Sequence, residues 1–256
     1  MADGIMLLEG EGASRGVLEI RIDRPDKKNA LTGAMYRVMT AALADASARA
    51  DIGVVLFTAA GDAFCAGNDL GDFMNGPEGG AAAFAFIRAI AAFDKPIVVA
   101  VQGLAVGVGT TMLMHCDLIY AAPDARFIMP FVNLGLVPEA GSSLIAPAMM
   151  GHAKAAAMLL LGEPMDAQAA DGVGLITAIV PRESLENHAR VKAAALMAKP
   201  PQALMLTRQL MKGDPILLNA RIEEEARLFR ETLGSAEAQE AFAAFFEKRA
   251  PVFRQE

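Results

Sequence analysis

Two loops of this 256-residue chain contain residue types that could stabilise developing negative charge. The first, residues 102–111, is rich in glycine and is expected to follow a strand and open a helix, whose free N–H groups can face an anion. By itself this loop also fits an ordinary strand-to-helix turn, and it is no dinucleotide fingerprint because Met112 stands where the third glycine belongs. Residues 63–70 form a second such loop, with small residues where a backbone must approach another group. The pair favours a site built from backbone N–H groups.

Acid–base chemistry in this chain is expected to rest on a carboxylate, because 30 Asp and Glu residues stand beside three histidines and two cysteines. Cys65 and Cys116 cannot build a disulfide framework or a cysteine-rich zinc site. His115 lies among Met and Leu residues and is interpreted as a packed histidine. Ser142 and Ser143 lack the Gly-x-Ser-x-Gly elbow of a hydrolase nucleophile. The composition does not say which carboxylate would act.

The formal net charge of −7 argues against a general nucleic-acid binder, which usually presents a basic face. A local basic cluster can still hold a phosphate-bearing small molecule, and residues 24–29 form such a cluster in a polar turn. Residues 1–16 carry acids where a signal peptide has its positive region, and no long apolar stretch follows them. We therefore expect a cytoplasmic protein that binds no nucleic acid.

A membrane helix is the alternative for residues 96–116, which carry no charged side chain and reach the required length of about 20 residues. The first part, residues 97–101, is a short β-branched run typical of a buried strand. A glycine-rich turn and a second apolar segment with a helical pattern follow. Because the period changes and polar residues interrupt the segment, we expect a buried core and no membrane partner.

Short apolar strands alternate with helices as far as residue 200, which implies crossover connections and a mostly parallel sheet, hence an α/β fold. Strands are expected at 17–22, 54–58, 97–101, 118–121 and 175–180, and helices at 32–50, 81–93, 109–116, 142–161 and 183–199. The alternating pattern of the first strand predicts that it is half-buried. Thr32 is the expected cap of the first helix.

Only helical patterns follow Pro200 and Pro201: one helix with Leu204, Arg208 and Met211, then residues 216–233 and 236–248. We therefore expect a core region, residues 1–200, and a C-terminal helical layer, residues 201–256, that serves as an oligomer contact or lid.

Several separated motifs, in order along nearly the whole chain, resemble the crotonase (enoyl-CoA hydratase/isomerase) superfamily. They are Arg-Pro at 24–25, Asn-Ala-Leu at 29–31, Ala-Gly-Asn-Asp-Leu at 66–70, Lys-Pro at 95–96, the glycines of 103–109, Cys-Asp at 116–117 and the tail 246–253. The resemblance implies a spiral of β-β-α units, an acyl-CoA thioester substrate, and a homotrimer or dimer of trimers. It implies no cofactor and no metal, since coenzyme A is part of the substrate.

The resemblance also implies site residues. The backbone N–H groups of Asn68 and Val108 fall where family members bind the thioester oxygen, and loss of one such donor costs about 10²–10³ in rate in other enzymes. Lys27 and Lys28 would lie near the CoA phosphates, joined by Lys248 from a neighbouring subunit. The further expected substrate-binding residues are Ala66, Gly67, Asp69, Leu70, Gly107, Thr111 and Phe131.

The acids decide which family reaction is expected. Thr111 and Phe131 occupy the positions of the two glutamates that hydratases use, so hydration by that mechanism is not expected. Glu139 falls where peroxisomal-type Δ3,Δ2-enoyl-CoA isomerases place their single catalytic glutamate, and Asp72-Phe73 also resembles that branch. We therefore expect isomerisation of 3-enoyl-CoA to trans-2-enoyl-CoA. The apolar surroundings of Glu139 would raise its pKa.

Three alternatives stay open. Glu139 could merely stabilise a helix N-terminus, where carboxylates are common. The chain could act as a hydratase-like enzyme or as a thioester hydrolase. It could also bind acyl-CoA without catalysing a reaction.

Overall fold

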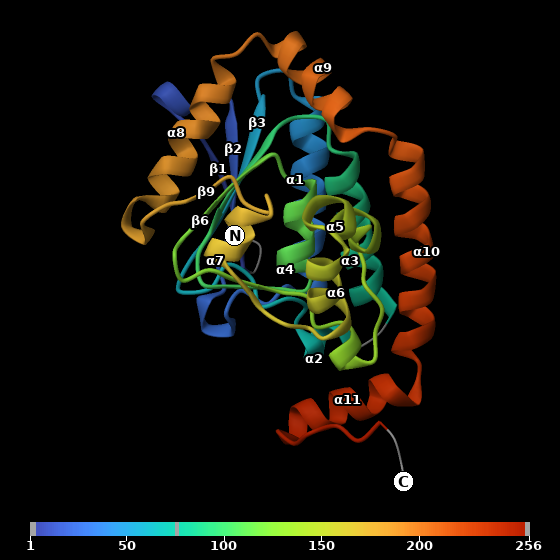
Figure 1. Cartoon of the computed structure of the whole chain (residues 1–256). Helices are drawn as coiled ribbons and strands as arrows, with labels where there is room; N and C mark the ends of the chain where they lie inside the picture. The colour runs from blue at the N-terminus through green and yellow to red at the C-terminus, as the bar shows by residue number, and fades with distance from the viewer. Residues whose placement is uncertain (1–3, 75–76, 254–256) are drawn as a thin grey trace.

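The computed structural model describes residues 4–74 and 77–253 and has an α/β architecture (Figure 1). The main sheet has the strand order β1 (Ile5–Glu9), β2 (Val17–Ile22), β3 (Val54–Ala59), β4 (Ile97–Val101), β6 (Leu118–Ala121) and β9 (Ala178–Ile179). β1 is antiparallel to β2, and all the other neighbours in this sheet are parallel, as the alternation of strands and helices predicts. A smaller sheet has the order β5 (Leu104–Val106), β7 (Arg126–Ile128) and β8 (Met165–Asp166).

Helices cover both faces of the main sheet. The α-helices before residue 200 are α1 (Gly33–Ala48), α2 (Leu70–Met74), α3 (Pro77–Ala92), α4 (Val108–Thr111), α5 (Ser142–Met150), α6 (His152–Leu160), α7 (Ala167–Gly172) and α8 (Leu185–Met197). Short 3₁₀ turns are η1 (Gly12–Ser14), η2 (Pro25–Lys27), η3 (Met112–His115), η4 (Val132–Leu134) and η5 (Arg182–Ser184). Along β3, Val54 and Leu56 pack toward α8, while Val55 and Phe57 belong to the larger core that contains α1 and α3. This alternation is the period of two that a strand imposes.

Most predicted elements agree with the structure. The helix expected at 109–116 is the short α4 followed by the 3₁₀ turn η3, and three further differences occur. Thr32 caps α1 by accepting a hydrogen bond from Met35 N (3.3 Å), as expected. The expected helix at 142–161 is two helices, α5 and α6, separated at Gly151, whose φ of 77° lies outside the helical region. The expected strand at 175–180 shortens to the two residues of β9.

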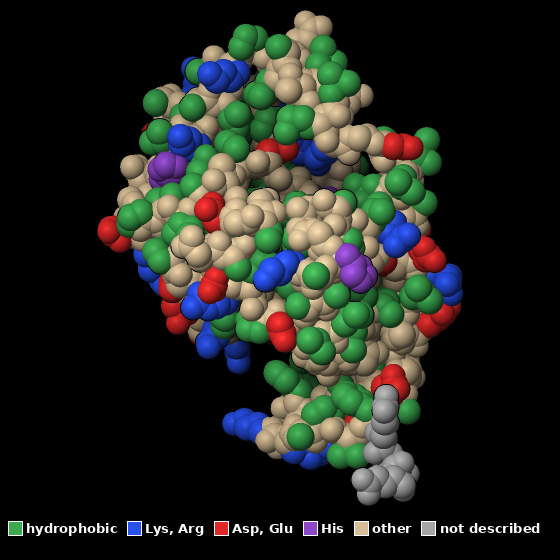
Figure 2. All heavy atoms as spheres, in the orientation of Figure 1, with side chains coloured by type: hydrophobic (Ala, Val, Ile, Leu, Met, Phe, Trp, Pro, Cys, Tyr) green, Lys and Arg blue, Asp and Glu red, His purple; other side chains and the backbone are tan. Residues whose placement is uncertain are grey.

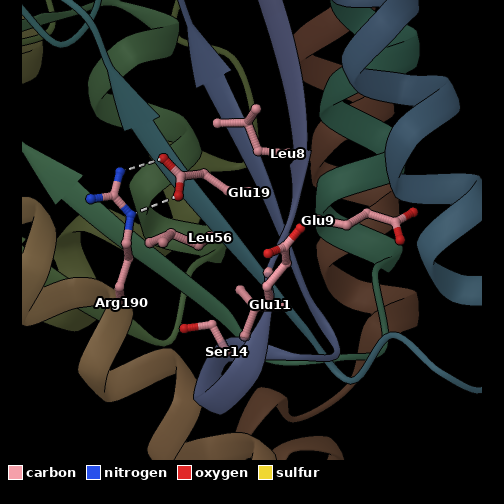
Figure 3. A pocket seen from close by; sticks show the side chains of 9 residues that line it. Leu8, Glu9, Glu11, Ser14, Glu19, Leu56 and Arg190 are labelled. Atoms are coloured by element: carbon pink, nitrogen blue, oxygen red, sulfur yellow. Dashed lines mark hydrogen bonds and ion pairs between the residues drawn. The ribbon is translucent and has the colours of Figure 1, made fainter.

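The third difference concerns β2, which is buried on both faces instead of half-buried. It lies between β1 and β3, and α8 covers the face that the alternating pattern assigns to solvent. Glu19 of β2 is 7% exposed and receives two hydrogen bonds from Arg190 of α8, each 2.8 Å long (Figure 3). A charged residue on this strand therefore marks a buried ion pair, which sequence alternation alone cannot distinguish from a solvated face.

Three helices follow residue 200: α9 (Pro201–Lys212), α10 (Pro215–Leu233) and α11 (Ala236–Glu247). Ile222, Ala226 and Phe229 of α10 are buried in the same hydrophobic core as α1 and α3. α11 lies beyond the body of the molecule and contacts η4. Figure 2 shows a hollow between this helix and the body at the bottom of the view. The division of the chain at residue 200 stays a prediction.

The apolar segment 96–116 folds into β4, β5, α4 and η3, so it is no single helix. Within residues 4–74 and 77–253, no helix has the length and apolar character needed to cross a membrane.

Candidate active site

The backbone of Asn68 is presented to a cavity by a parallel bridge to Leu31. Leu31 N donates to Gly67 O (2.8 Å), and Leu31 O accepts from Asp69 N (2.9 Å). In a parallel bridge these bonds use the residues on either side of the bridged one, so the N–H of Asn68 points away from Leu31. The chain thus leaves a donor free to face the opposite side.

The glycine-rich loop 102–111 packs directly against the loop 63–70 that carries Asn68. Cys65 N donates to Leu104 O (3.0 Å), and Val106 N donates to Cys65 O (2.9 Å), which joins the two loops side by side. A Cβ atom on Gly109 would lie 2.8 Å from Cys65 O, so only glycine permits this approach. Val108, the first residue of α4, is held next to Asn68 in this way, and both residues line the same two cavities.

The larger cavity has a volume of about 540 Å³ and lies between the two loops, η4 and α11. Its polar groups include Lys27, Asn68 and Asp69, and its apolar wall includes Phe131 and Phe242. This size and this lining are typical of a small-molecule site. We call this space the outer cavity.

The smaller cavity, which we call the inner cavity, has a volume of about 10 Å³, room for about one water molecule. It shares Asn68, Val108 and Phe229 with the outer cavity, so the two are neighbours. Its other lining residues are Tyr36, Ala83, Phe84, Ile87 and Glu139. A carboxyl group therefore lies in the same small space as the two candidate N–H donors.

Glu139 is 4% exposed and is the acidic residue of that space. Thr111 of α4 donates its hydroxyl hydrogen to Glu139 Oε1, while Glu139 Oε2 is buried without a hydrogen-bond partner among the described residues. Burial raises the pKa of Glu139 to about 8, since the Thr111 hydrogen bond only partly offsets it and nearby Glu225 adds to it. The raised pKa agrees with the expectation from the apolar sequence around it.

Most of the expected substrate-binding residues come together around the outer cavity. They are Lys27, Ala66, Gly67, Asn68, Asp69, Leu70, Gly107, Val108 and Phe131. Three expected residues line neither cavity. Thr111 is fully buried and contacts Glu139 instead, because its position in the first turn of α4 turns the side chain inward. Lys28 and Lys248 are exposed at left-handed turns, and the role of Lys248 at a neighbouring subunit stays a prediction.

Several residues or contacts of the site were not predicted from the sequence. Tyr36 of α1 donates its hydroxyl hydrogen to Asn68 Oδ1, which fixes the Asn68 side chain. Phe84 of α3 and Phe229 of α10 close the inner cavity, with ring centroids 5.5 Å apart in an edge-to-face arrangement. Arg24 pairs with Asp69 at 2.7 Å. The buried faces of the predicted helices contained Tyr36 and Phe229, but helical periodicity does not distinguish a cavity wall from solid core.

Within the described ranges, no three His, Cys, Asp or Glu side chains are grouped in a way that could hold a metal ion. The inner cavity is lined by the acidic residue Glu139, by Asn68 and Val108 with their candidate N–H donors, and by apolar side chains. The outer cavity adds the charged residues Lys27 and Asp69.

The sequence profile described as enoyl-CoA hydratase/isomerase matches residues 12–256. Rat enoyl-CoA delta isomerase 2 is 36% identical over 253 residues, which cover 95% of this chain but 64% of the rat protein. A Rhodobacter capsulatus protein named "Probable enoyl-CoA hydratase" is also 36% identical, over 94% of this chain and 95% of its own length. The chain thus spans somewhat less than two thirds of the rat relative and nearly all of the bacterial one.

Solved structures of enoyl-CoA hydratase/isomerase proteins are similar to this chain as well. The crystal structure of an enoyl-CoA hydratase/isomerase from Pseudoalteromonas atlantica T6c superposes with a TM-score of 0.93 at 40% identity. The match covers 98% of this chain and 100% of that one. The expected spiral crotonase fold is therefore confirmed.

Proposed function

Since the chain belongs to the enoyl-CoA hydratase/isomerase family, whose members act on acyl-CoA thioesters, we propose that it isomerises 3-enoyl-CoA to trans-2-enoyl-CoA with Glu139 as the single acid–base group. The observation that carries the proposal is the lining of the inner cavity, in which Glu139 is the acidic residue next to Asn68 and Val108. Thr111 and Phe131 supply no second carboxylate there.

In the proposed reaction the Glu139 carboxylate removes a proton from C2 of the acyl chain. The electrons of that C–H bond form a dienolate, whose negative charge rests on the thioester oxygen and is stabilised by Asn68 N–H and Val108 N–H. The dienolate then takes the proton back at C4, the C2–C3 double bond forms, and the thioester carbonyl is restored. No atom is gained or lost, because Glu139 removes one proton at C2 and returns one proton at C4.

The protonation of Glu139 suits such a shuttle. A general base works best when its pKa lies near the operating pH, and burial raises the pKa of Glu139 to about 8. Its Oε2 has no hydrogen-bond partner among the described residues, which leaves that oxygen available for the proton. The Thr111 hydroxyl on Oε1 orients the carboxyl group.

Substrate entry has to widen the inner cavity, because about 10 Å³ does not hold an acyl chain. We expect this widening at the pair Phe84 and Phe229, which lines the inner cavity where α3 contacts α10. The outer cavity, with Lys27 on its rim, is large enough for the pantetheine arm and would place the CoA phosphates near that lysine.

The decisive experiment compares 3-enoyl-CoA isomerisation and crotonyl-CoA hydration by the wild-type protein, Glu139→Gln and the control Glu163→Gln, whose exposed carboxyl group lies outside both cavities. We expect isomerisation in the wild type and control, and a loss of about 10²–10⁴ in kcat in Glu139→Gln with CoA affinity retained. Rapid hydration that Glu139→Gln leaves unchanged would contradict the proposal. Binding of acyl-CoA without turnover in the wild type would favour a non-catalytic acyl-CoA binder.

The C-terminal layer carries a second proposal, self-association. Exposed apolar side chains gather along α9 and the start of α10: Met205, Leu206, Leu210, Met211, Ile216 and Leu217. Such a patch marks an interaction surface on a protein. We expect a homotrimer or dimer of trimers in sedimentation velocity, and a monomer across the micromolar range would rule it out.

A further inference from the structure

The loop that carries Glu139 has an unusual backbone. Ala140 has φ = 61° and Gly141 has φ = 70°, and both values are left-handed. Glycine adopts this region freely, whereas an alanine there costs about 1 kcal/mol or more and persists only when its surroundings hold it. The Ser142 hydroxyl contributes from within the loop by donating to Glu139 O at 2.6 Å. Other elements must supply the remaining contacts that keep Ala140 in this conformation.

Glu225 of α10 supplies such contacts to the loop. Its carboxylate accepts hydrogen bonds from Gly141 N (2.6 Å), Ser143 N (3.0 Å) and Ser143 Oγ (2.5 Å). Glu225 is 4% exposed, although its neighbours Glu223 and Glu224 on the same helix are exposed. Burying a carboxylate costs free energy unless hydrogen bonds compensate for the lost water. Here two N–H groups of one short loop supply these bonds, and the bonds fix the position of that loop.

His115 of η3 also holds the loop. Its Nε2 lies 2.8 Å from Ala140 O, and since a carbonyl only accepts, Nε2 carries the proton. Burial lowers the pKa of His115 to about 4, so the ring stays neutral at physiological pH. A histidine of η3 thus bonds the strained residue Ala140, and a glutamate of α10 bonds the next residue of the loop, Gly141.

We propose that Glu225 is a positioning residue of the C-terminal layer, which fixes the loop carrying Glu139 and thereby sets the geometry and protonation of the catalytic carboxyl group. The inference rests on the function proposed above. It makes α10 part of the catalytic apparatus, in addition to its packing role. The titratable and charged groups that face this loop are Tyr36 of α1, His115 of η3, and Arg221 and Glu225 of α10.

The charge of Glu225 has a predictable effect. Burial is the main cause of the raised pKa of Glu139, and the negative charge of Glu225 raises it further. Glu225→Gln removes that charge and replaces one accepting oxygen by a donor that faces an N–H group. The pKa of Glu139 should therefore fall, and the loop should lose part of the hydrogen bonding that fixes its position.

The test measures isomerisation from pH 5 to 9 for the wild type, Glu225→Gln and the matched control Glu224→Gln, an exposed acid one residue away. We expect Glu225→Gln to lower kcat by about 10- to 100-fold with little change in KM, and to move the acidic limb of the profile to lower pH. The control should match the wild type. A uniform loss of kcat without a shift of the limb would overturn the proposal, as would an unchanged kcat.

A second readout needs no activity and separates this inference from the proposed function. Unfolding free energies are measured against pH for Glu225→Gln, Glu139→Gln and the double variant, and the coupling between the two sites is taken from the cycle. We expect a coupling that grows between pH 5 and 8, and additivity at all pH values would refute the inference even if the wild type is an isomerase. If wild-type isomerisation is absent but the coupling is present, only the proposed function fails.

If Glu225→Gln does not fold, Ser143→Ala keeps the buried charge and removes the hydroxyl group, with its hydrogen bond to Glu225 and the one that it accepts from Arg221. We then expect a several-fold lower kcat at unchanged KM, and an unchanged kcat would overturn the proposal.

Discussion

Glu19 and Glu139 are both buried glutamates, but the two regions around them give the carboxyl groups opposite properties. Glu19 accepts two hydrogen bonds from Arg190, each 2.8 Å long (Figure 3). It also accepts one of 2.8 Å from Thr58, and Arg21 lies nearby. Within the described ranges, Glu139 has the Thr111 hydroxyl as its hydrogen-bond partner and no cation. Burial acts on both residues, so the difference lies in their partners.

The pKa values follow the partners. Burial alone would raise the pKa of Glu19, but the hydrogen bonds from Arg190 and Thr58 and the charges of Arg190 and Arg21 outweigh it and lower the pKa. At Glu139 nothing outweighs burial, and the pKa rises to about 8. A surface cavity of about 200 Å³ lies beside Glu19. The Glu19 carboxylate is ionised and paired with cations, so it carries no proton that it could exchange with a bound molecule. Burial thus stabilises structure in one region and prepares a proton shuttle in the other.

The largest expected effect is on the pH dependence of isomerisation. Below the pKa of Glu139 the rate at limiting substrate should fall about 10-fold per pH unit, because only the ionised base accepts a proton. We expect an acidic limb near pH 8 in kcat/KM profiles recorded from pH 5 to 9. Glu19→Gln should keep that limb in place. A limb near the ordinary glutamate value would mean that Glu139 is not the base.

The next effect is on stability and concerns Glu19. Glu19→Gln leaves Arg190 without its main partner, although Arg190 is partly exposed and still contacts Glu186, so we expect a loss of about 1–3 kcal/mol at pH 7. Since the folded pKa of Glu19 is lowered, this contribution is complete above the ordinary value of 4.5 and disappears as the pH falls through the folded value. Urea unfolding at pH 7 and pH 3 measures it. An equal loss at both pH values would contradict this assignment.

A second effect on stability has the opposite sign and concerns Glu139. The folded pKa is raised, so wild-type stability should decline as the pH rises from the ordinary value of 4.5 to about 8, where the buried group finally ionises. Glu139→Gln removes this cost, and we expect it to be more stable than the wild type by up to several kcal/mol at pH 8 and equal to it near pH 4. Thermal unfolding in parallel buffers tests this. A Glu139→Gln variant that is less stable at pH 8 would show that the carboxylate is structurally required.

Much of the fold was predictable because its signals are local. The cap at Thr32, the β-branched run of β4 and the helical pattern after Pro200 each depend on residues within one turn or one strand. The strands β1, β5, β7 and β8 were not predicted. The last three have two or three residues, which contain too little of a period to be recognised.

The candidate site was predictable only in part. The two loops were visible in the sequence because glycines that permit close approach are a local requirement. Thr111 was expected at the substrate and instead contacts Glu139. Glu225 was hidden in a run of three glutamates, although its spacing from Ile222 and Phe229 placed it on the buried stripe of α10.

The sequence by itself determined the order of the elements, the two backbone-donor loops and the scarcity of acid–base groups other than carboxylates. The tertiary structure decided which buried glutamate meets a cation and which does not. The physical reason is distance along the chain. Arg190 lies 171 residues from Glu19, and Glu225 lies 84 residues from the Gly141 N–H that it accepts from. The protonation of a carboxyl group depends on such neighbours, which only folding brings within hydrogen-bond range.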